Sequence, residues 1–370
     1  MPTVLVTATR SEIDTSSSPA AATITTSKDI TARNVSRVSD ALAHVPSLYL
    51  GASSNGQIPS FTGNFSLRGM DASRTLVLID GVQPLQNANS QRVNWLTLPV
   101  DDIERVEVVP GAFSSLYGSN AMGGVINVIS KSPGKRELTV RLKNGFGDAS
   151  GEDASVYFRD KFSTGLGITA SLSRNRRDGY VSDYVVSTPA TGAAGTPVVG
   201  AQVGTSTAGE PAYIVGNRGQ QPWLQTNASI KLSYDISSSD HLYAGFAQAD
   251  AEAGFNRFNT YLTNTATGAS VYSGTLGIAG KRVTLTEANF LGNSPLIDSS
   301  KRWFAGYEGL VGKDMKLKVD VAQINRESSF PTADTTATWN AGLGKLTNAP
   351  DSGLDGVATL SFPLGERTLW

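Results

Sequence analysis

From residue 135 to the end of the chain, apolar and polar residues alternate along one segment after another. In the segment 224–236, even positions carry mainly Leu, Ala, Ile and Tyr, while odd positions carry Gln, Asn, Ser, Lys and Asp. Successive side chains of a β-strand point to opposite faces of a sheet, so this period predicts strands with one apolar and one polar face. Eight such segments are recognisable, near residues 138–143, 156–161, 166–173, 224–236, 242–246, 303–310, 315–321 and 360–364.

The joints between these segments are of two lengths. Residues 148–153 and 237–240 form short joints, whereas 176–222 and 251–301 form long ones. Short turns at one end and long loops at the other are typical of a transmembrane β-barrel, whose strands carry this alternation. A soluble β-sandwich also alternates but seldom has loops of this length, so the pattern favours barrel strands.

The first third of the chain has a different pattern, with short strands and short helices. The continuous apolar run 76–79 predicts a strand buried on both faces, and Asp80 and Gly81 predict a turn after it. Ser27 is expected to be a helix N-cap, and Gly118 to close a helical turn that begins near Phe113. Further strands are expected at 105–109 and 125–129, and polar loops at 51–64 and 84–95. This part is therefore a small mixed α and β unit.

Five short motifs follow one another in this first third. They are TVLVTA at 3–8, FSLRG at 65–69, LVLIDGV at 76–82, IERVEVVPG at 103–111 and LYGSNAMGGVINVI at 116–129. Each motif alone is only a short strand or turn. Together, in this order and spacing, they resemble the plug domain of TonB-dependent outer-membrane receptors, and somewhat the cobalamin and siderophore branches of that family.

The resemblance implies a fold, a location and a function. The fold is an α+β plug domain followed by antiparallel transmembrane β-barrel strands, in the bacterial cell outer membrane. The expected divisions are 1–20 for the TonB box and linker, 21–134 for the plug domain and 135–370 for the N-terminal portion of the barrel. The implied function is TonB-dependent active import of a scarce ligand, such as a ferric siderophore or cobalamin. The implied partners are TonB, the ligand and outer-membrane lipid, with no cofactor.

The same resemblance assigns roles to residues of the first domain. A short extended segment on a polar tether suits strand addition to TonB, through main-chain hydrogen bonds. The expected TonB-binding residues are Thr3, Val4, Leu5, Val6, Thr7 and Ala8. The expected substrate contacts are Asn55, Gly56, Gln57, Arg92 and Trp95, on the two polar loops. The expected contacts between plug and barrel are Arg68, Glu104, Arg105 and Glu107.

Composition excludes several other classes of protein. The 370 residues include no Cys, which excludes a disulfide scaffold and a thiolate metal site. A formal net charge of −1 argues against a nucleic-acid binder. With only two His, no metal-ligand spacing and no phosphate-binding glycine loop before a helix, an enzyme is not expected. Asp178 and Asp183 alone are weak grounds for a calcium site. His44 and His241 are expected to be structural rather than ligands.

The length of the second region leaves a question of completeness. Plugged outer-membrane transporters have about 22 strands, and 22 spans of about ten residues need about 220 residues. The residues after 134 then leave too few for the long loops. We therefore expect the plug and the first part of a barrel, which alone does not make a stable transporter. The alternative function is a ligand-binding or truncated receptor that does not transport.

Overall fold

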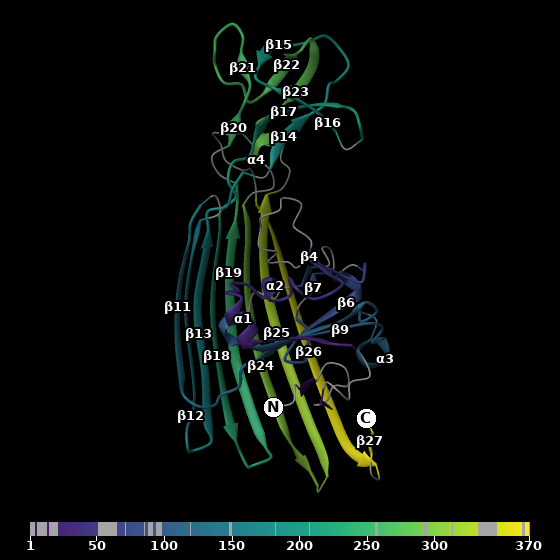
Figure 1. The fold of residues 1–370 in the computed structure, drawn as a ribbon, viewed down its shortest axis with the longest axis vertical. Helices are drawn as coiled ribbons and strands as arrows, with labels where there is room; N and C mark the ends of the chain where they lie inside the picture. Colours follow the sequence, from purple (N-terminus) through teal and green to yellow (C-terminus); the bar gives the residue numbers. More distant parts are fainter. Residues whose placement is uncertain are drawn as a thin grey trace.

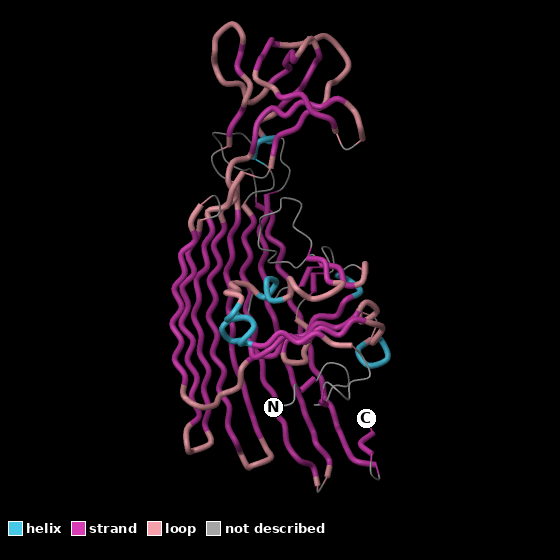
Figure 2. Tube along the Cα trace, viewed as in Figure 1, coloured by secondary structure: helices cyan, strands magenta, loops and turns pink. Residues whose placement is uncertain are grey.

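The fold was analysed in a computed structural model of the chain. It describes residues 4–5, 13–14, 21–50, 65–70, 72–84, 86–87, 92–93, 98–118, 120–147, 150–181, 183–206, 208–255, 258–291, 295–312, 314–331, 346–364 and 367–369. Three parts are visible in Figures 1 and 2: a long curved sheet, a small domain against one of its faces, and a module beyond one end of its strands. Within the described ranges, no helix is both long and apolar enough to cross a membrane.

The small domain, here called the inner domain, has a four-stranded sheet at its centre. The strand order is β3-β9-β10-β6, with β10 antiparallel to β9 and parallel to β6. Its strands are β3 (Thr23–Thr26), β6 (Thr75–Ile79), β9 (Ile103–Pro110) and β10 (Gly124–Ser130). Its helices are α1 (Ser27–Ala32), α2 (Val38–Ala41), α3 (Ser114–Tyr117) and the 3-10 turns η2 (Ala72–Arg74) and η3 (Val100–Asp102). Apolar residues of β6, β9, β10, α1 and α2 form a shared core.

Local sequence signals explain most of these elements. All five residues of β6 are buried, which confirms the strand expected at 76–79. Asp80 and Gly81 follow with φ values of 54° and 85°, as the expected turn requires. Gly118 ends α3 with a φ of 84°. The N-cap of α1 is Thr26 rather than Ser27, because the Thr26 hydroxyl accepts from the Asp29 amide while the Asp29 carboxylate accepts from the Thr26 amide.

The long sheet, here called the wall sheet, is an antiparallel meander. Its strand order is β11-β12-β13-β18-β19-β24-β25-β26-β27, and each strand pairs antiparallel with the next. The strands are β11 (Glu137–Gly145), β12 (Gly151–Lys161), β13 (Leu166–Arg177), β18 (Trp223–Asp235), β19 (His241–Ala253), β24 (Leu296–Val311), β25 (Met315–Pro331), β26 (Leu346–Leu364) and β27 (Arg367–Leu369). The strands expected from alternation are therefore present, in chain order.

The two faces of the wall sheet have the reverse of the usual burial pattern. Leu142, Leu172 and Leu354 are exposed by 62% to 77%, whereas Ser300 and Thr169 are exposed by 1% or less. Apolar side chains thus point away from the inner domain, and polar side chains point toward it. An outward apolar band with a polar interior is the distribution that a lipid environment requires of a spanning sheet.

The two long joints fold together into a small module with its own core, here called the loop module. Figure 1 shows it beyond the ends of β13, β18 and β19. Val215, Leu262, Val283 and Phe290 are fully buried in it, although they come from different loops. Its elements are β14 (Tyr184–Ser187), β15 (Thr196–Val199), β16 (Gln202–Thr205), β17 (Pro211–Asn217), β20 (Asn259–Thr260), β21 (Thr263–Asn264), β22 (Gly274–Ile278), β23 (Lys281–Leu285) and α4 (Ala288–Leu291). Sequence patterns had predicted only loops here.

Three short two-stranded ladders complete the described structure. β1 (Val4–Leu5) pairs with β2 (Ile13–Asp14), and β4 (Leu48–Leu50) pairs with β5 (Phe65–Leu67). β7 (Gln86–Asn87) pairs with β8 (Arg92–Val93). All three ladders are antiparallel.

Candidate functional site

The interface between the inner domain and the wall sheet is built from hydrogen bonds and ion pairs. One cluster of polar contacts, here called a tie, is centred on Asp80, in the turn after β6. Its carboxylate accepts from the Ser130 amide at 2.8 Å and from the Ser130 hydroxyl at 2.9 Å. Lys231 of β18 donates to the same hydroxyl at 2.7 Å. Burial by itself would raise the pKa of Asp80, but the charges of Lys231 and Arg302 and the Ser130 hydrogen bonds outweigh it and lower that pKa.

A second tie is centred on Asp102, at the end of η3. Asp102 is 5% exposed and accepts a 3.1 Å hydrogen bond from Ser229 of β18. The Ser229 hydroxyl also lies 2.8 Å from that of Ser171 on β13. Burial raises the pKa of Asp102 to about 6, against the opposing charge of Lys231. Among the described residues, its second carboxylate oxygen has no hydrogen-bond partner.

Further ties extend across the width of the wall sheet. Asp101 forms a 2.7 Å salt bridge with Arg141 of β11 and accepts from Ser155 of β12. Arg302 of β24, which is 3% exposed, donates to the Ile79 carbonyl at 3.3 Å. The amide of Gln83 donates to Asp355 of β26 at 2.7 Å. Polar groups of five wall strands therefore bind the inner domain in the ties described so far. These strands are β11, β12, β18, β24 and β26.

The segment between α1 and α2 makes another group of contacts with the wall. The Ser36 hydroxyl donates to Asp153 of β12 at 2.6 Å. Lys143 of β11 donates to the Asn34 carbonyl at 2.9 Å and the Val35 carbonyl at 3.2 Å. Both carbonyls lie in the segment after α1, and the Lys143 ammonium also donates to the Ser36 hydroxyl at 3.2 Å, so its three N–H groups can bind three acceptors of this segment.

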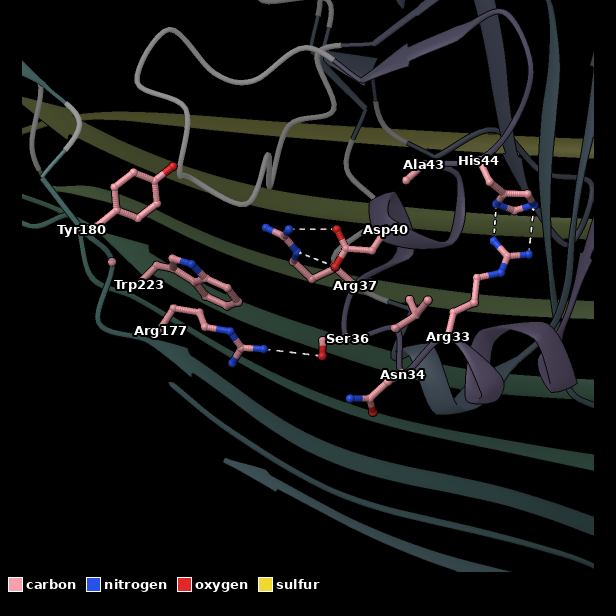
Figure 3. Close-up of a pocket in the computed structure, with 12 residues that line it drawn as sticks. Arg33, Asn34, Ser36, Arg37, Asp40, Ala43, His44, Arg177, Tyr180 and Trp223 are labelled. Carbon is pink, nitrogen blue, oxygen red and sulfur yellow. Dashed lines mark hydrogen bonds and ion pairs between the residues drawn. The ribbon is translucent and has the colours of Figure 1, made fainter. Parts of the chain in front are cut away.

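A cavity of about 610 Å³ adjoins these contacts, between the inner domain and the wall (Figure 3). Arg177, at the end of β13, and Trp223, at the start of β18, line it from the wall. It therefore lies at the end of the wall strands from which the long joints leave. The inner domain contributes Arg33, Asn34, Val35, Ser36, Arg37, Asp40, Ala43 and His44, and the segment after β13 contributes Gly179 and Tyr180.

The residues expected to contact the barrel lie on the inner domain in varied settings. Arg105 and Glu107 form a 2.7 Å salt bridge with each other, and Glu107 is fully buried. Arg68 is exposed with a φ of 54°, and Glu104 is exposed. Their contacts with the barrel remain a prediction. The wall contacts described above involve Asp101 and Asp102 directly and Asp80 through Ser130. Paired acidic residues next to an expected strand were the signal available in the sequence for two of these three.

Of the eleven residues expected to bind ligand or TonB, three lie within the described part of the chain. Thr3, Val6, Thr7, Ala8, Asn55, Gly56, Gln57 and Trp95 lie outside the described residues. Val4 and Leu5 form the strand β1, and Arg92 begins β8, so the backbone of these three is described. Their roles in binding also remain predictions.

The histidines and the loop carboxylates have ordinary structural partners. A ring nitrogen of His44 lies 3.2 Å from the Thr25 hydroxyl, and His241 contacts Asp235 at 2.8 Å. Asp178 forms a salt bridge with Arg176, and Asp183 forms one with Arg218. Within the described part of the chain, no group of three or more His, Cys, Asp or Glu residues is arranged to hold a metal ion.

Comparisons with known proteins match this architecture. The family model described as "TonB-dependent Receptor Plug Domain" matches residues 14–125. The vitamin B12 transporter BtuB of Vibrio vulnificus is 32% identical over 195 residues, which cover 49% of this chain and 31% of the transporter. The iron-regulated outer membrane virulence protein of Vibrio cholerae is 28% identical over 172 residues, which cover 43% of this chain and 25% of that protein.

A solved structure supports the same architecture over almost the whole chain. A crystal structure of a variant of the ferric enterobactin receptor PfeA of Pseudomonas aeruginosa aligns with 98% of this chain. The TM-score is 0.63 and the sequence identity 20%, so the likeness concerns the fold. The alignment covers 48% of the receptor, so this chain spans about half of that solved structure and a smaller share of the curated relatives.

Proposed function

We propose, on the premise that this chain belongs to the TonB-dependent receptors of the bacterial outer membrane, that it serves TonB-driven import of a scarce extracellular ligand. The candidate ligands are a ferric siderophore, cobalamin or a compound of similar kind. A vitamin B12 transporter and a ferric enterobactin receptor are among the similar proteins, which supports this choice of classes.

The observation that carries this proposal is the polar attachment of the inner domain to the wall sheet. Asp101 and Asp102 bond directly to wall residues, and Asp80 is linked to Lys231 of the wall through the Ser130 hydroxyl. Breaking an apolar interface would expose hydrophobic surface, whereas polar groups can exchange their partners for water. A pulling force can therefore displace a domain attached in this way along the wall sheet at a lower free-energy cost than a domain attached through an apolar interface.

The proposed point of force is the segment 3–8. The pairing of Val4 and Leu5 with Ile13 and Asp14 supports this role, because these two residues of the segment are already extended and paired in a ladder. TonB would add a strand to the same backbone groups through main-chain hydrogen bonds. Substrate contacts at Asn55, Gly56, Gln57, Arg92 and Trp95 are part of the same proposal.

Binding of the periplasmic TonB C-terminal domain to the chain tests the proposal. Val6→Pro removes a backbone donor and blocks strand pairing, so it is expected to abolish binding. Ser17→Pro, in the polar stretch that follows, is the matched control and is expected to leave binding intact. Binding that is indifferent to Val6→Pro would contradict the proposed coupling segment. It would favour the second candidate, a ligand-binding receptor that does not transport.

The similar proteins named above are a transporter, a receptor and an outer-membrane protein, which agrees with a protein that is not an enzyme. A role in uptake then needs a direct measurement. Cells that depend on one ligand for growth should accumulate it through the receptor that contains this chain, and Val6→Pro should abolish that accumulation. Accumulation unchanged by the substitution would exclude TonB coupling through this segment.

A further inference from the structure

The cavity between the inner domain and the wall sheet has an excess of positive charge. Three guanidinium groups, those of Arg33, Arg37 and Arg177, line it, and among the described residues of the lining Asp40 carries the one carboxylate. Asp153 lies next to it and Lys143 binds the neighbouring backbone. Cations thus outnumber anions around this space even when both neighbours are counted.

Arg33 contributes charge that no salt bridge among the described residues neutralises, although it interacts electrostatically with Asp29. Its guanidinium contacts the ring of His44, with Nη2 lying 3.1 Å from Nε2 (Figure 3). Burial lowers the pKa of His44, and the charge of Arg33 lowers it further, so the imidazole is neutral at pH 7. In the described part of the chain, no carboxylate lies within salt-bridge distance of Arg33.

The other two guanidinium groups are held in place from opposite sides. Arg37 of the inner domain forms two hydrogen bonds with Asp40, at 3.0 and 2.8 Å. Arg177 of the wall forms two with Asp153, at 2.6 and 2.8 Å. Both lie against the indole of Trp223, with their central carbons 5.7 and 5.5 Å from the ring centroid. Each guanidinium has five N–H donors, and Arg37 uses two of them on Asp40. Arg177 also donates to the Arg176 carbonyl at 2.7 Å and to the Ser36 hydroxyl at 3.5 Å. Arg37 therefore keeps more donors for a further acceptor than Arg177 does.

We propose that this cavity is a binding site for a small anion with several carboxylate or phosphate oxygens. Arg33, Arg37 and Arg177 are the groups that donate to it. Planar guanidinium groups match the geometry of both kinds of oxyanion, which makes arginine well suited to bind either one. Because Arg37 belongs to the inner domain and Arg177 to the wall, a bound anion would touch both parts. The site does not depend on TonB or on transport.

Calorimetric titration of the purified 370-residue chain in detergent with citrate and with inorganic phosphate tests this proposal. The ionic strength is held constant with chloride, because screening weakens exposed charge pairs. The chain is expected to bind at least one of these anions, and their relative affinities distinguish a carboxylate ligand from a phosphate ligand. Arg33→Gln should lower the affinity at least tenfold. Arg174→Gln, on the same strand as Arg177 but outside the cavity lining, is the matched control and should have no effect.

A second variant, at Asp40, should change the affinity for the anion in the opposite direction. Asp40→Asn removes the carboxylate that competes for Arg37, so it should raise the affinity several-fold. Absence of binding to the wild-type chain would overturn the proposal. Equal affinities for wild type, Arg33→Gln and Asp40→Asn would also overturn it, because such binding would occur elsewhere on the molecule.

Discussion

The ammonium group of Lys231 lies 2.7 Å from the hydroxyl of Ser130, which joins the wall sheet to the last strand of the inner domain. The two residues are 101 positions apart in the chain. The same hydroxyl donates to Asp80, so one serine connects a wall cation to a carboxylate of the inner domain. This relationship suggests that attachment of the inner domain depends on a few buried polar groups.

Removing the Lys231 ammonium should weaken this attachment. Lys231→Met removes the wall cation whose charge most lowers the pKa of the partly buried Asp80. Removal of one partner from a fully buried charge pair costs about 3–5 kcal/mol, so a smaller loss of stability is expected here. Hydrogen exchange of the backbone amides in β10 should become faster. Lys161→Met, at an exposed salt bridge with Asp235, is the control and should leave that exchange unchanged. Equal protection of β10 in both variants would exclude a role for Lys231 in attachment.

The stability of the attachment should depend on pH through Asp102. Its pKa is about 6 in the folded protein and 3.8 without burial, so the folded state binds more protons between these values. The contribution of neutral Asp102 is therefore fully present below pH 3.8 and is lost as the pH rises through about 6. Asp80 has a lowered pKa, so its contribution is lost only at more acidic pH.

Asp102→Asn should accordingly stabilise the protein at pH 7.5 and change little below pH 4. A pKa difference of about two units corresponds to about 3 kcal/mol. Thermal unfolding of both proteins in detergent at pH 4, 5, 6 and 7.5 measures this difference. The Asn side chain can still accept from Ser229, so the hydrogen bond is retained. A constant difference in melting temperature across this range would refute the assignment to Asp102.

Gly124 should not tolerate a side chain. Its φ is 146°, and a Cβ would lie 2.5 Å from a Leu67 side-chain carbon and 2.6 Å from the Val109 carbonyl oxygen. Backbone strain and overpacking each cost about 1–3 kcal/mol. Gly124→Ala should therefore lower the free energy of unfolding of the inner domain by several kcal/mol. Gly134→Ala is the control, because its Cβ would meet only the Ser132 carbonyl, at 3.9 Å. Equal free energies of unfolding for both variants, measured by chemical denaturation, would show that β10 can shift to accept the methyl group.

The loop module should unfold separately from the wall sheet. Phe290 is fully buried in the module and packs edge-on against Tyr272, with the two ring centroids 5.3 Å apart. Phe290→Ala should cost about 3–5 kcal/mol and open the module to proteolysis. Val203→Ala is the control, since Val203 is 80% exposed. Faster cleavage in the long joints, with the wall strands still protected, is the expected result. Simultaneous cleavage of wall and module would indicate a single cooperative unit.

The sequence alone determined the fold class because the relevant signals are local. Alternation along 224–236 predicted β18, and the apolar run at 76–79 predicted β6, since strand periodicity is set by neighbouring residues. The order of the five short motifs indicated the plug domain, and the family comparison confirms it. The predicted N-cap of α1, Ser27, was wrong by one residue. Thr26 and Ser27 are both good caps, and only the backbone geometry selects between them.

The tertiary structure alone decided which side chains join the inner domain to the wall sheet. The expected contacts of Arg105 and Glu107 with the barrel remain a prediction, beside the salt bridge that these two residues form with each other. Asp102 accepts a hydrogen bond from Ser229 of the wall, and Asp80 is linked to Lys231 of the wall through the Ser130 hydroxyl. Such contacts link residues about a hundred positions apart, and the local pattern does not encode which strand face meets which residue. The shared core of Leu262 and Val215 was missed for the same reason, because each loop lacks a periodic apolar pattern. Its apolar residues become a core only when the two loops pack together.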